Sequence, residues 1–290
     1  MSQSPSSNPA TRQATSTTDR FHQEIHDLRP WYHDFARLGL QTDFEAPGGP
    51  VARVREALRL VALAGWRILS GNRVERRDNL ALRQLIDPRA NSHRINQRHK
   101  EDVILPLTEE ALARLSDQGV KEPACLDLFC ADGYYSCLIA SLSPQVRVTG
   151  IDLDGQHVER ARTAARVLGF DRLDFVIADV WEYLRQARTF DLALCTGGLY
   201  HLEQPRALLA LLRPVVTGFL VVQSVVTLQT EDAGFFVSPA PGWKYGSRFT
   251  HARLAGWLEE TGWEIVRQER NELKGNRRLD DRGGSYFLCR

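Results

Sequence analysis

The 290-residue sequence lacks any apolar run that would cross a membrane. A membrane-spanning helix needs about 18 or more apolar residues in succession, and the longest such run, residues 214–226, is interrupted by polar residues. The first residues also lack the charged and apolar segments of a secretory signal peptide. We therefore expect no membrane partner and a cytoplasmic location.

An excess of charge of one sign is absent as well. The chain carries 37 Lys and Arg against 36 Asp and Glu, for a net charge of +1. Proteins that bind nucleic acids usually have a clear basic excess, so this balance argues against a large RNA or DNA interface. One basic cluster stands out at residues 91–100. It fits a solvated helix face, or a surface that meets an anionic acceptor.

Paired cysteine motifs are missing too, since no two of the five cysteines form a CxxC pattern. Four of them lie inside apolar segments that resemble strands or helices. Buried, reduced thiols are the expected state, and neither a zinc site nor any other metal site is predicted. The cysteines are Cys125, Cys130, Cys137, Cys195 and Cys289.

The chain divides into three parts by composition. Residues 1–18 are polar with almost no apolar content, which predicts a disordered tail. Residues 19–118 form a helical N-terminal extension, with apolar-periodic runs at 51–68 and 103–115. Residues 119–290 alternate between two kinds of pattern and predict an α/β domain with an insertion at 228–249.

In this last part, short apolar runs typical of strands alternate with helical patterns. Such alternation implies right-handed crossovers and a buried, mostly parallel sheet of the Rossmann-like kind. Seven strands are expected, at residues 124–129, 146–151, 173–177, 190–195, 217–226, 264–269 and 285–289. The last two are joined by a polar loop and would form an antiparallel edge.

Acidic and small residues follow the expected strands. Asp127 begins a turn of small residues that reaches Gly133, Asp152 follows the second strand, and Asp179 follows the third. Ligands of such sheets bind at the carboxyl ends of the strands. Each aspartate alone is also consistent with a helix cap or a solvated strand end, but three at successive strand ends favour a ligand site. The loop at 196–201 would close over its reacting end.

These segments resemble the cofactor-binding motifs of class I S-adenosylmethionine (SAM) dependent methyltransferases, best over residues 124–226. The first motif of that family is acidic-x-Gly-x-Gly-x-Gly, and this sequence has Phe129 and Ala131 at two of the glycine positions. Residues 132–136, 198–202 and 31–33 are similar to the subgroup that contains the tRNA wobble-uridine carboxymethyl-transferring enzymes.

The resemblance implies SAM as the cofactor. Asp152 would hold the ribose hydroxyls and Asp179 the adenine. A nicotinamide cofactor is disfavoured, because it requires G-x-G-x-x-G after the first strand and this turn lacks it. The residues that the resemblance places around the cofactor are Asp127, Phe129, Cys130, Ala131, Asp132, Gly133, Asp152, Leu153, Asp179, Val180, Thr196, Gly197 and Leu199.

The reaction needs alignment more than acid–base catalysis, because the sulfonium is already activated. If the acceptor must lose a proton, His201 is the candidate base, and Tyr200 would orient the acceptor. Packing beside the next helix is an equal alternative for His201. Aromatic segments outside the common core are candidates for the acceptor site, and their residues are Trp31, Tyr32, His33, Trp243 and Arg248.

Three functional classes follow from these observations. We favour a methyltransferase that acts on a small-molecule acceptor. A tRNA-modifying methyl- or carboxymethyltransferase is the second class, suggested by the subgroup and by the basic cluster. A SAM-fold binding module without catalytic activity is the third, suggested by the altered first motif. The oligomeric state is not predicted by the sequence.

Overall fold

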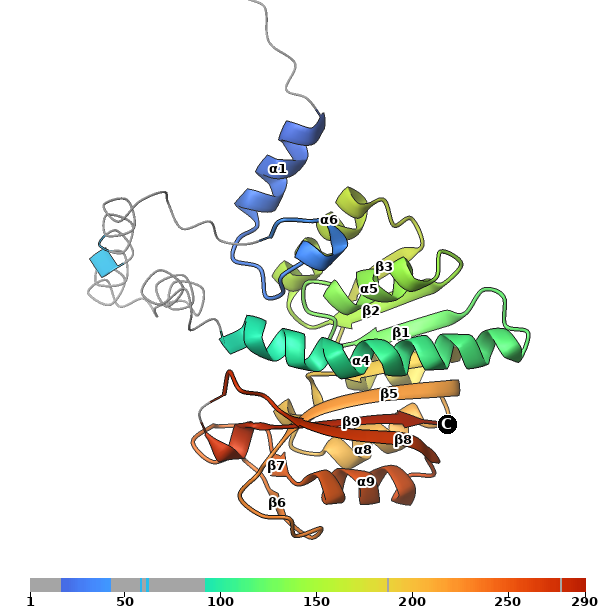
Figure 1. Cartoon of the computed structure of the whole chain (residues 1–290), viewed down its shortest axis with the longest axis vertical. Coiled ribbons are helices and arrows are strands. Elements are labelled where there is room, and N and C mark those ends of the chain that lie inside the picture. Colours follow the sequence, from blue (N-terminus) through green and yellow to red (C-terminus); the bar gives the residue numbers. More distant parts are fainter. Residues whose placement is uncertain (1–16, 43–57, 59–60, 63–91, 187, 277) are drawn as a thin grey trace, which may run out of the picture.

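The computed structural model describes residues 17–42, 58, 61–62, 92–186, 188–276 and 278–290 (Figure 1). Almost all of the expected disordered tail, and most of the apolar-periodic run at 51–68, lie outside the described residues.

A seven-stranded sheet forms the centre of the described structure, in the order β3-β2-β1-β4-β5-β9-β8. The first five strands are mutually parallel, and β9 is antiparallel to both of its neighbours. This confirms the mostly parallel seven-stranded sheet and the antiparallel pair at its edge. The strands are β1 (Ala124–Leu128), β2 (Arg147–Asp152), β3 (Leu173–Ile177), β4 (Phe190–Thr196), β5 (Val216–Val226), β8 (Ile265–Glu272) and β9 (Gly283–Cys289).

Helices cover both faces of this sheet (Figure 1). One face carries α1 (Thr17–Asp27), α4 (Ser92–Asp117), α5 (Tyr134–Leu142) and α6 (Gly155–Leu168). The other carries α7 (Val180–Gln186), α8 (Pro205–Leu212) and α9 (His251–Glu260). Among these helices, none combines the length and the hydrophobicity needed to span a bilayer.

Because both faces are covered, the central strands are apolar at almost every position. In β4, Leu192 and Leu194 pack against the α4–α6 face, whereas Ala193 and Cys195 pack against the α7–α9 face. The same alternation in β5 directs Val221 to the first face. This alternation fixes the face on which each polar residue at a strand end must lie.

The N-terminal segment is attached to the α/β core along α6. Arg166 of α6 forms an ion pair of 2.7 Å with Glu24 of α1, and Arg160 donates a hydrogen bond of 2.8 Å to the carbonyl oxygen of Leu28. The chain then continues through the short helix η1 (Ala36–Leu38). Farther along the chain, α4 runs across the sheet with Pro106 inside it, and packs into the same hydrophobic core.

The insertion after β5 contains a small two-stranded sheet that the sequence did not predict. It pairs β6 (Phe236–Val237) with β7 (Arg248–Phe249). The carbonyl oxygen of Phe249 accepts a hydrogen bond of 3.0 Å from the Thr227 amide, which anchors the insertion to the end of β5. The insertion therefore lies at the carboxyl ends of the parallel strands.

Candidate functional site

The order of the strands reverses between β1 and β4, which run side by side from the centre of the sheet. Connections from these two strands leave in opposite directions, and sheets of this kind bind their ligands above the carboxyl ends of the strands at such a point. The loops after β1, β2, β3 and β4 all meet at this edge. The sequence-predicted cofactor residues lie on these four loops.

The turn after β1 adopts left-handed backbone at three alternate positions. Phe129 has φ 59°, Ala131 has φ 48° and Gly133 has φ 79°. The first two carry a side chain where left-handed backbone costs about 1–2 kcal/mol. A Cβ on Gly133 would lie 2.7 Å from the Cβ of Ala161, so only glycine fits there. The turn thus has left-handed backbone even at its two substituted glycine positions.

The loops after β1 and β4 are in close contact at one point. A Cβ on Gly198 would overlap the ring of Phe129. Phe129 therefore packs over the start of η2 (Leu199–His201), the short helix that carries Tyr200. This contact couples the cofactor turn to the loop that borders the reacting centre.

Asp152 occupies the end of β2 and organises the turns around it. Its Oδ2 accepts a hydrogen bond of 3.0 Å from the Ala131 amide, and its Oδ1 accepts one of 2.9 Å from the Asp154 amide. The side chain is half-buried. Each carboxylate oxygen can accept a second hydrogen bond, which is what a ribose diol requires.

Two apolar side chains lie exposed beside Asp152. Leu153 is 70% exposed, and Ile177, the register partner of Asp152 in β3, is 53% exposed. Exposed apolar side chains on adjacent strand ends suit the faces of a flat ring such as adenine. The sequence reasoning missed Ile177. The sequence feature that could have indicated Ile177 is an apolar residue at the last position of a strand, two positions before Asp179.

Asp179 caps the helix that follows it. Its Oδ1 accepts hydrogen bonds from the amides of Trp181 (2.8 Å) and Glu182 (3.2 Å). The N-cap interpretation of this residue is therefore confirmed. Val180, the first residue of α7, is buried. These contacts occupy one oxygen of the carboxylate, and the assignment of the adenine contact to Asp179 stays a prediction.

Asp127 is completely buried at the end of β1. Its Oδ2 accepts a hydrogen bond of 2.6 Å from the Ser136 hydroxyl, while its Oδ1 has no partner within the described part of the chain. Burial raises the pKa of Asp127 to about 7, against the opposing effects of Ser136 and His33. A buried carboxyl group with one unpartnered oxygen is suited to a cationic ligand.

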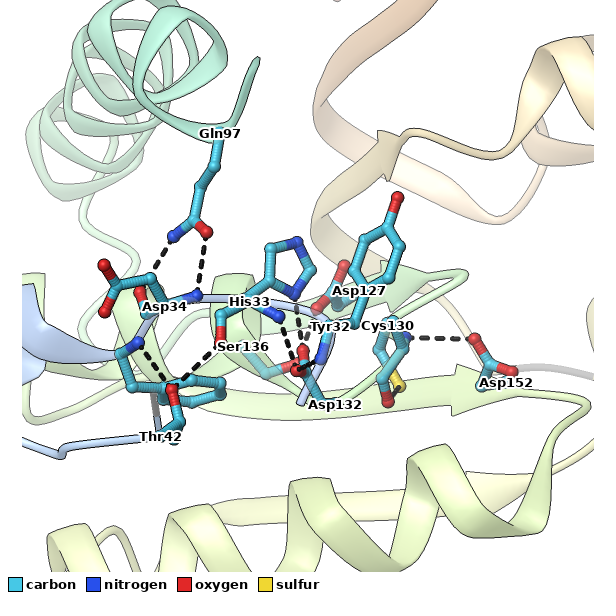
Figure 2. Close-up of polar contacts among 12 residues, drawn as sticks. Tyr32, His33, Asp34, Thr42, Gln97, Asp127, Cys130, Asp132, Ser136 and Asp152 are labelled. Atoms are coloured by element: carbon cyan, nitrogen blue, oxygen red, sulfur yellow. Dashed lines mark hydrogen bonds and ion pairs between the residues drawn. The ribbon is translucent and has the colours of Figure 1, made fainter. Parts of the chain in front are cut away.

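Asp132 fixes the N-terminal segment to the cofactor turn (Figure 2). It is fully buried, and its Oδ2 accepts hydrogen bonds from the amides of Tyr32 (2.8 Å) and His33 (2.7 Å). The Oδ1 lies 2.5 Å from Nδ1 of His33. Burial would raise the pKa of Asp132, but the contacts with His33 outweigh it and hold the pKa below its usual value. The sequence assigned Asp132 to the cofactor, whereas here its carboxylate holds residues 32–33.

The three aromatic residues at 31–33 therefore have different positions. Trp31 is buried in the core, and its indole N–H donates to the carbonyl oxygen of Ile25 at 2.9 Å. Its expected contact with an acceptor does not agree with this burial, which leaves only 6% of the residue exposed. His33 stacks on Tyr134 at 5.2 Å between ring centroids. Tyr32 is 38% exposed beside the cofactor turn.

The loop after β4 begins with buried Thr196, followed by Gly197 at φ 75° and buried Leu199. It brings Tyr200 and His201 together, with ring centroids 4.1 Å apart. Tyr200 is half-buried and His201 is exposed. An exposed imidazole at this strand end is accessible to an acceptor.

Arg248 holds the insertion against this loop. Its guanidinium is buried, forms an ion pair of 2.6 Å with Asp281, and donates to the carbonyl oxygen of Tyr200 at 3.4 Å. The expected acceptor contact by Arg248 is corrected accordingly, because its charge is already paired. Trp243, by contrast, is 44% exposed on the same insertion, so it remains a candidate for the acceptor.

The basic cluster at 91–100 is divided between solvent and the domain. Arg98 is exposed, but the carbonyl oxygen of His99 accepts a hydrogen bond of 2.7 Å from Asn271. Lys100 Nζ lies 3.9 Å from the point where a Cβ on Gly197 would lie. Burial lowers the pKa of Lys100 to about 8. No ion pair of Lys100 with a described residue occurs, so its ammonium is available to an anion at the cofactor edge.

All five cysteines are buried and unpaired, as expected. Burial raises the pKa of Cys130 well above its usual value, which disfavours a thiolate beside the cofactor turn. No cluster of three or more potential metal ligands occurs in the part of the chain that the structure describes. A hollow of about 490 Å³ lies at the opposite edge of the sheet, beside Gln118 and Arg213, away from these loops.

Comparison with known families decides which kind of domain carries this geometry. Residues 120–260 match the family model of a methyltransferase domain. The matched region spans β1 to α9 and contains the loops after β1, β2, β3 and β4. This match implies SAM as the cofactor, in agreement with the Rossmann-like fold of the sheet.

Curated relatives match this chain over short stretches. A trans-aconitate 2-methyltransferase of Streptomyces coelicolor is 37% identical over 83 residues, which are 28% of this chain and 27% of that protein. An uncharacterised protein of Synechococcus is 31% identical over 98 residues, or 33% of this chain and 24% of that protein. The chain thus spans about a quarter of the length of these relatives.

Among solved structures, the fold is similar to that of the N-terminal domain of EvdMO1, crystallised in the presence of S-adenosylhomocysteine (SAH) and D-fucose. The two share 17% sequence identity with a TM-score of 0.55, over 94% of this chain and 97% of that one. This similarity supports the Rossmann-like methyltransferase fold over almost the whole length of the chain.

Proposed function

We propose that this protein is a SAM-dependent methyltransferase that transfers a methyl group to a small-molecule acceptor. The observation that carries the proposal is the set of incompletely satisfied groups around the cofactor turn. Asp127 has a buried oxygen without a partner in the described chain, and Lys100 has an ammonium without an ion pair there. These features fit a cofactor that carries both a carboxylate and positive charge, with a net positive charge.

Each part of SAM has a candidate partner. Asp152 would accept the ribose hydroxyls, and Leu153 with Ile177 would cover the adenine. Asp127 would face the positive charge of the methionine part, and Lys100 its carboxylate. These assignments follow from charge, exposure and strand-end position, and they leave Tyr200 and His201 for the acceptor.

The bound cofactor supplies a methyl group already activated by the sulfonium. The protein then has to orient the acceptor and exclude water, which accounts for most of the rate of such a displacement. Tyr200 would orient the acceptor through its hydroxyl. His201, exposed beside it, would accept a proton from an acceptor that must lose one.

A small acceptor is favoured over tRNA by the arrangement of the basic cluster. A phosphate-binding face needs several exposed cations. Here the His99 ring accepts a hydrogen bond of 3.4 Å from the Lys274 amide, and Lys100 is half-buried toward Gly197. Exposed Trp243 and Tyr245 instead provide apolar surface on the insertion. This is the chemistry of a small-molecule site.

The curated relatives support a small-molecule acceptor only in part. The trans-aconitate 2-methyltransferase is named for a small-molecule acceptor. A 23S rRNA (uracil-C5)-methyltransferase of Marinomonas is 43% identical over 60 residues, which are 13% of its length, and it keeps RNA as the second candidate. The intact Asp152 and Asp179 argue against an inactive binding module.

Methyl transfer from labelled SAM tests the acceptor class. We expect label from a cell extract to enter the small-molecule fraction and not the tRNA fraction. Gel-shift titration should also show no tRNA binding at low or high salt. Salt-sensitive, submicromolar tRNA binding that is lost when Arg94 and Arg98 are both changed to Ala would contradict the proposal, because counterion release produces that salt dependence.

A further inference from the structure

Gln223 lies where the acceptor is expected, at the carboxyl end of β5. It is the register partner of Thr196, the last residue of β4, and its carbonyl oxygen accepts a hydrogen bond of 3.1 Å from the Gly197 amide. The loop with Tyr200 and His201 begins immediately after these residues. Gln223 is therefore fixed directly beneath that loop.

The side chain of Gln223 points to the α4–α5 face of the sheet. Phe219 and Val221 lie four and two residues before Gln223 in β5, and both pack into the core on that face. Leu220 and Val222 pack into the core on the opposite face. Because side chains alternate along a strand, Gln223 continues the first series. Lys100, on α4, lies on the same face.

The amide of Gln223 is buried without hydrogen bonds. The residue has no exposed surface, and neither Oε1 nor Nε2 has a partner among the described residues. Each such buried group lowers the stability of the folded chain, so a methionine would be favoured if packing alone mattered. Tyr286, the next residue across the sheet, shows the contrast, since its hydroxyl donates to Asn271 at 2.8 Å.

A second unpartnered group lies near the same edge. The hydroxyl of Tyr135, at the start of α5, is buried and has no partner in the described part of the chain. Burial, followed by Glu101, Tyr134 and Tyr286, raises the pKa of Tyr135 well above its usual value, so the hydroxyl stays neutral. Two neutral groups with unused hydrogen-bonding capacity thus lie near Tyr286, Gln223 as its register partner and Tyr135 as its electrostatic neighbour.

The chemistry of these groups selects a class of ligand. A glutamine amide offers a donor and an acceptor side by side. Its complement is a group that presents an acceptor and a donor in the same way, such as a primary carboxamide or a lactam. A carboxylate lacks the donor, and a tertiary amide lacks it as well.

We propose that Gln223 and Tyr135 form the acceptor-recognition subsite, and that the acceptor presents a carboxamide or lactam to the Gln223 amide. The inference rests on the proposed function, because it assumes that the methyl acceptor enters beside the loop after β4. It adds the chemical class of the acceptor, which the geometry of the cofactor site leaves open. The unsatisfied amide is then retained for binding and not for stability.

The test uses SAH-saturated protein titrated with 2-pyridone and benzamide, with N,N-dimethylbenzamide as the probe that lacks the N–H donor. Native protein should bind the first two and not the third. Gln223→Met, which keeps the volume, should weaken 2-pyridone and benzamide by at least about tenfold. Its affinity for SAH should stay within about twofold. Gln145→Met, at an exposed glutamine before β2, is the matched control and should bind like the native protein.

The melting temperature supplies an independent readout. Gln223→Met should melt at the native temperature or above it, because an unsatisfied buried amide has been removed. A fall of several degrees would show that the amide is structural and would overturn the inference. So would amide binding that is unchanged in Gln223→Met, or amide probes that fail to bind native protein. Failure of SAH itself to bind would instead reject the proposed function.

Discussion

Replacement of Asp132 by alanine should release the N-terminal segment from the domain and lower stability more than any other single change at the site. The carboxylate is fully buried and accepts three hydrogen bonds from residues 32–33. Its removal leaves two backbone amides and the His33 ring without their acceptor. Each buried group left without its hydrogen-bond partner costs about 1–3 kcal/mol, so the three together lower the melting temperature by roughly 10 °C for a chain of this size.

Calorimetric unfolding measures this loss, and limited trypsin digestion at Arg37, which precedes Leu38, reports the release directly. Asp154→Ala is the matched control, because Asp154 is an exposed N-cap of α6 that accepts a hydrogen bond from the Gln156 amide. That variant should lose only about 1 kcal/mol. Equal losses in the two variants, with no faster digestion after Asp132→Ala, would show that residues 29–42 are not held by this carboxylate.

The affinity for SAM should rise with pH up to about 7, with Asp127 as the titrating group. The free protein has a raised pKa of about 7 at this buried carboxyl group, so below that pH the group is protonated. A cationic ligand favours the ionised form, and binding must then release a proton. Each pH unit below 7 should therefore weaken binding by up to about tenfold.

Asp127→Asn should remove this dependence, leaving a weaker affinity that is flat between pH 5.5 and 7.5. The free variant should also be more stable than the native protein at pH 8. Since the pKa of Asp127 is higher in the folded chain than in the unfolded chain, its favourable contribution is complete below about pH 4 and is lost as the pH rises through 7. The gain at pH 8 is on the order of 2–4 kcal/mol. A native affinity that does not change with pH would remove Asp127 from the cofactor site.

The sheet was predictable because the sequence patterns that indicate its strands are local. Each expected strand is a short apolar run between turn residues, and helices intervene, so parallel pairing follows from the chirality of the crossovers. The runs at residues 173–177 and 285–289 lie within β3 and β9 as observed. The strand-end position of Asp152 and Asp179 follows from the same local pattern.

The attachment of residues 31–33 was not predictable, because its partner is about a hundred positions away. Asp132 lies in a turn of small residues, where the sequence pattern predicts that an acidic side chain contacts a ligand. Only the folded chain brings the Tyr32 and His33 amides to it. Arg248 illustrates the same limit, since its pairing with Asp281 turns an expected acceptor contact into a buried link. Long-range pairing of this kind leaves no periodic signal in the sequence.

Calorimetric titration with SAM, SAH and NAD tests the central claim most directly. The account predicts micromolar affinity for SAM and SAH, no measurable affinity for NAD, and a loss of at least about tenfold, or roughly 1.4 kcal/mol, in Asp152→Ala. Tight NAD binding, or SAM and SAH affinities that do not change when Asp152 is removed, would contradict it.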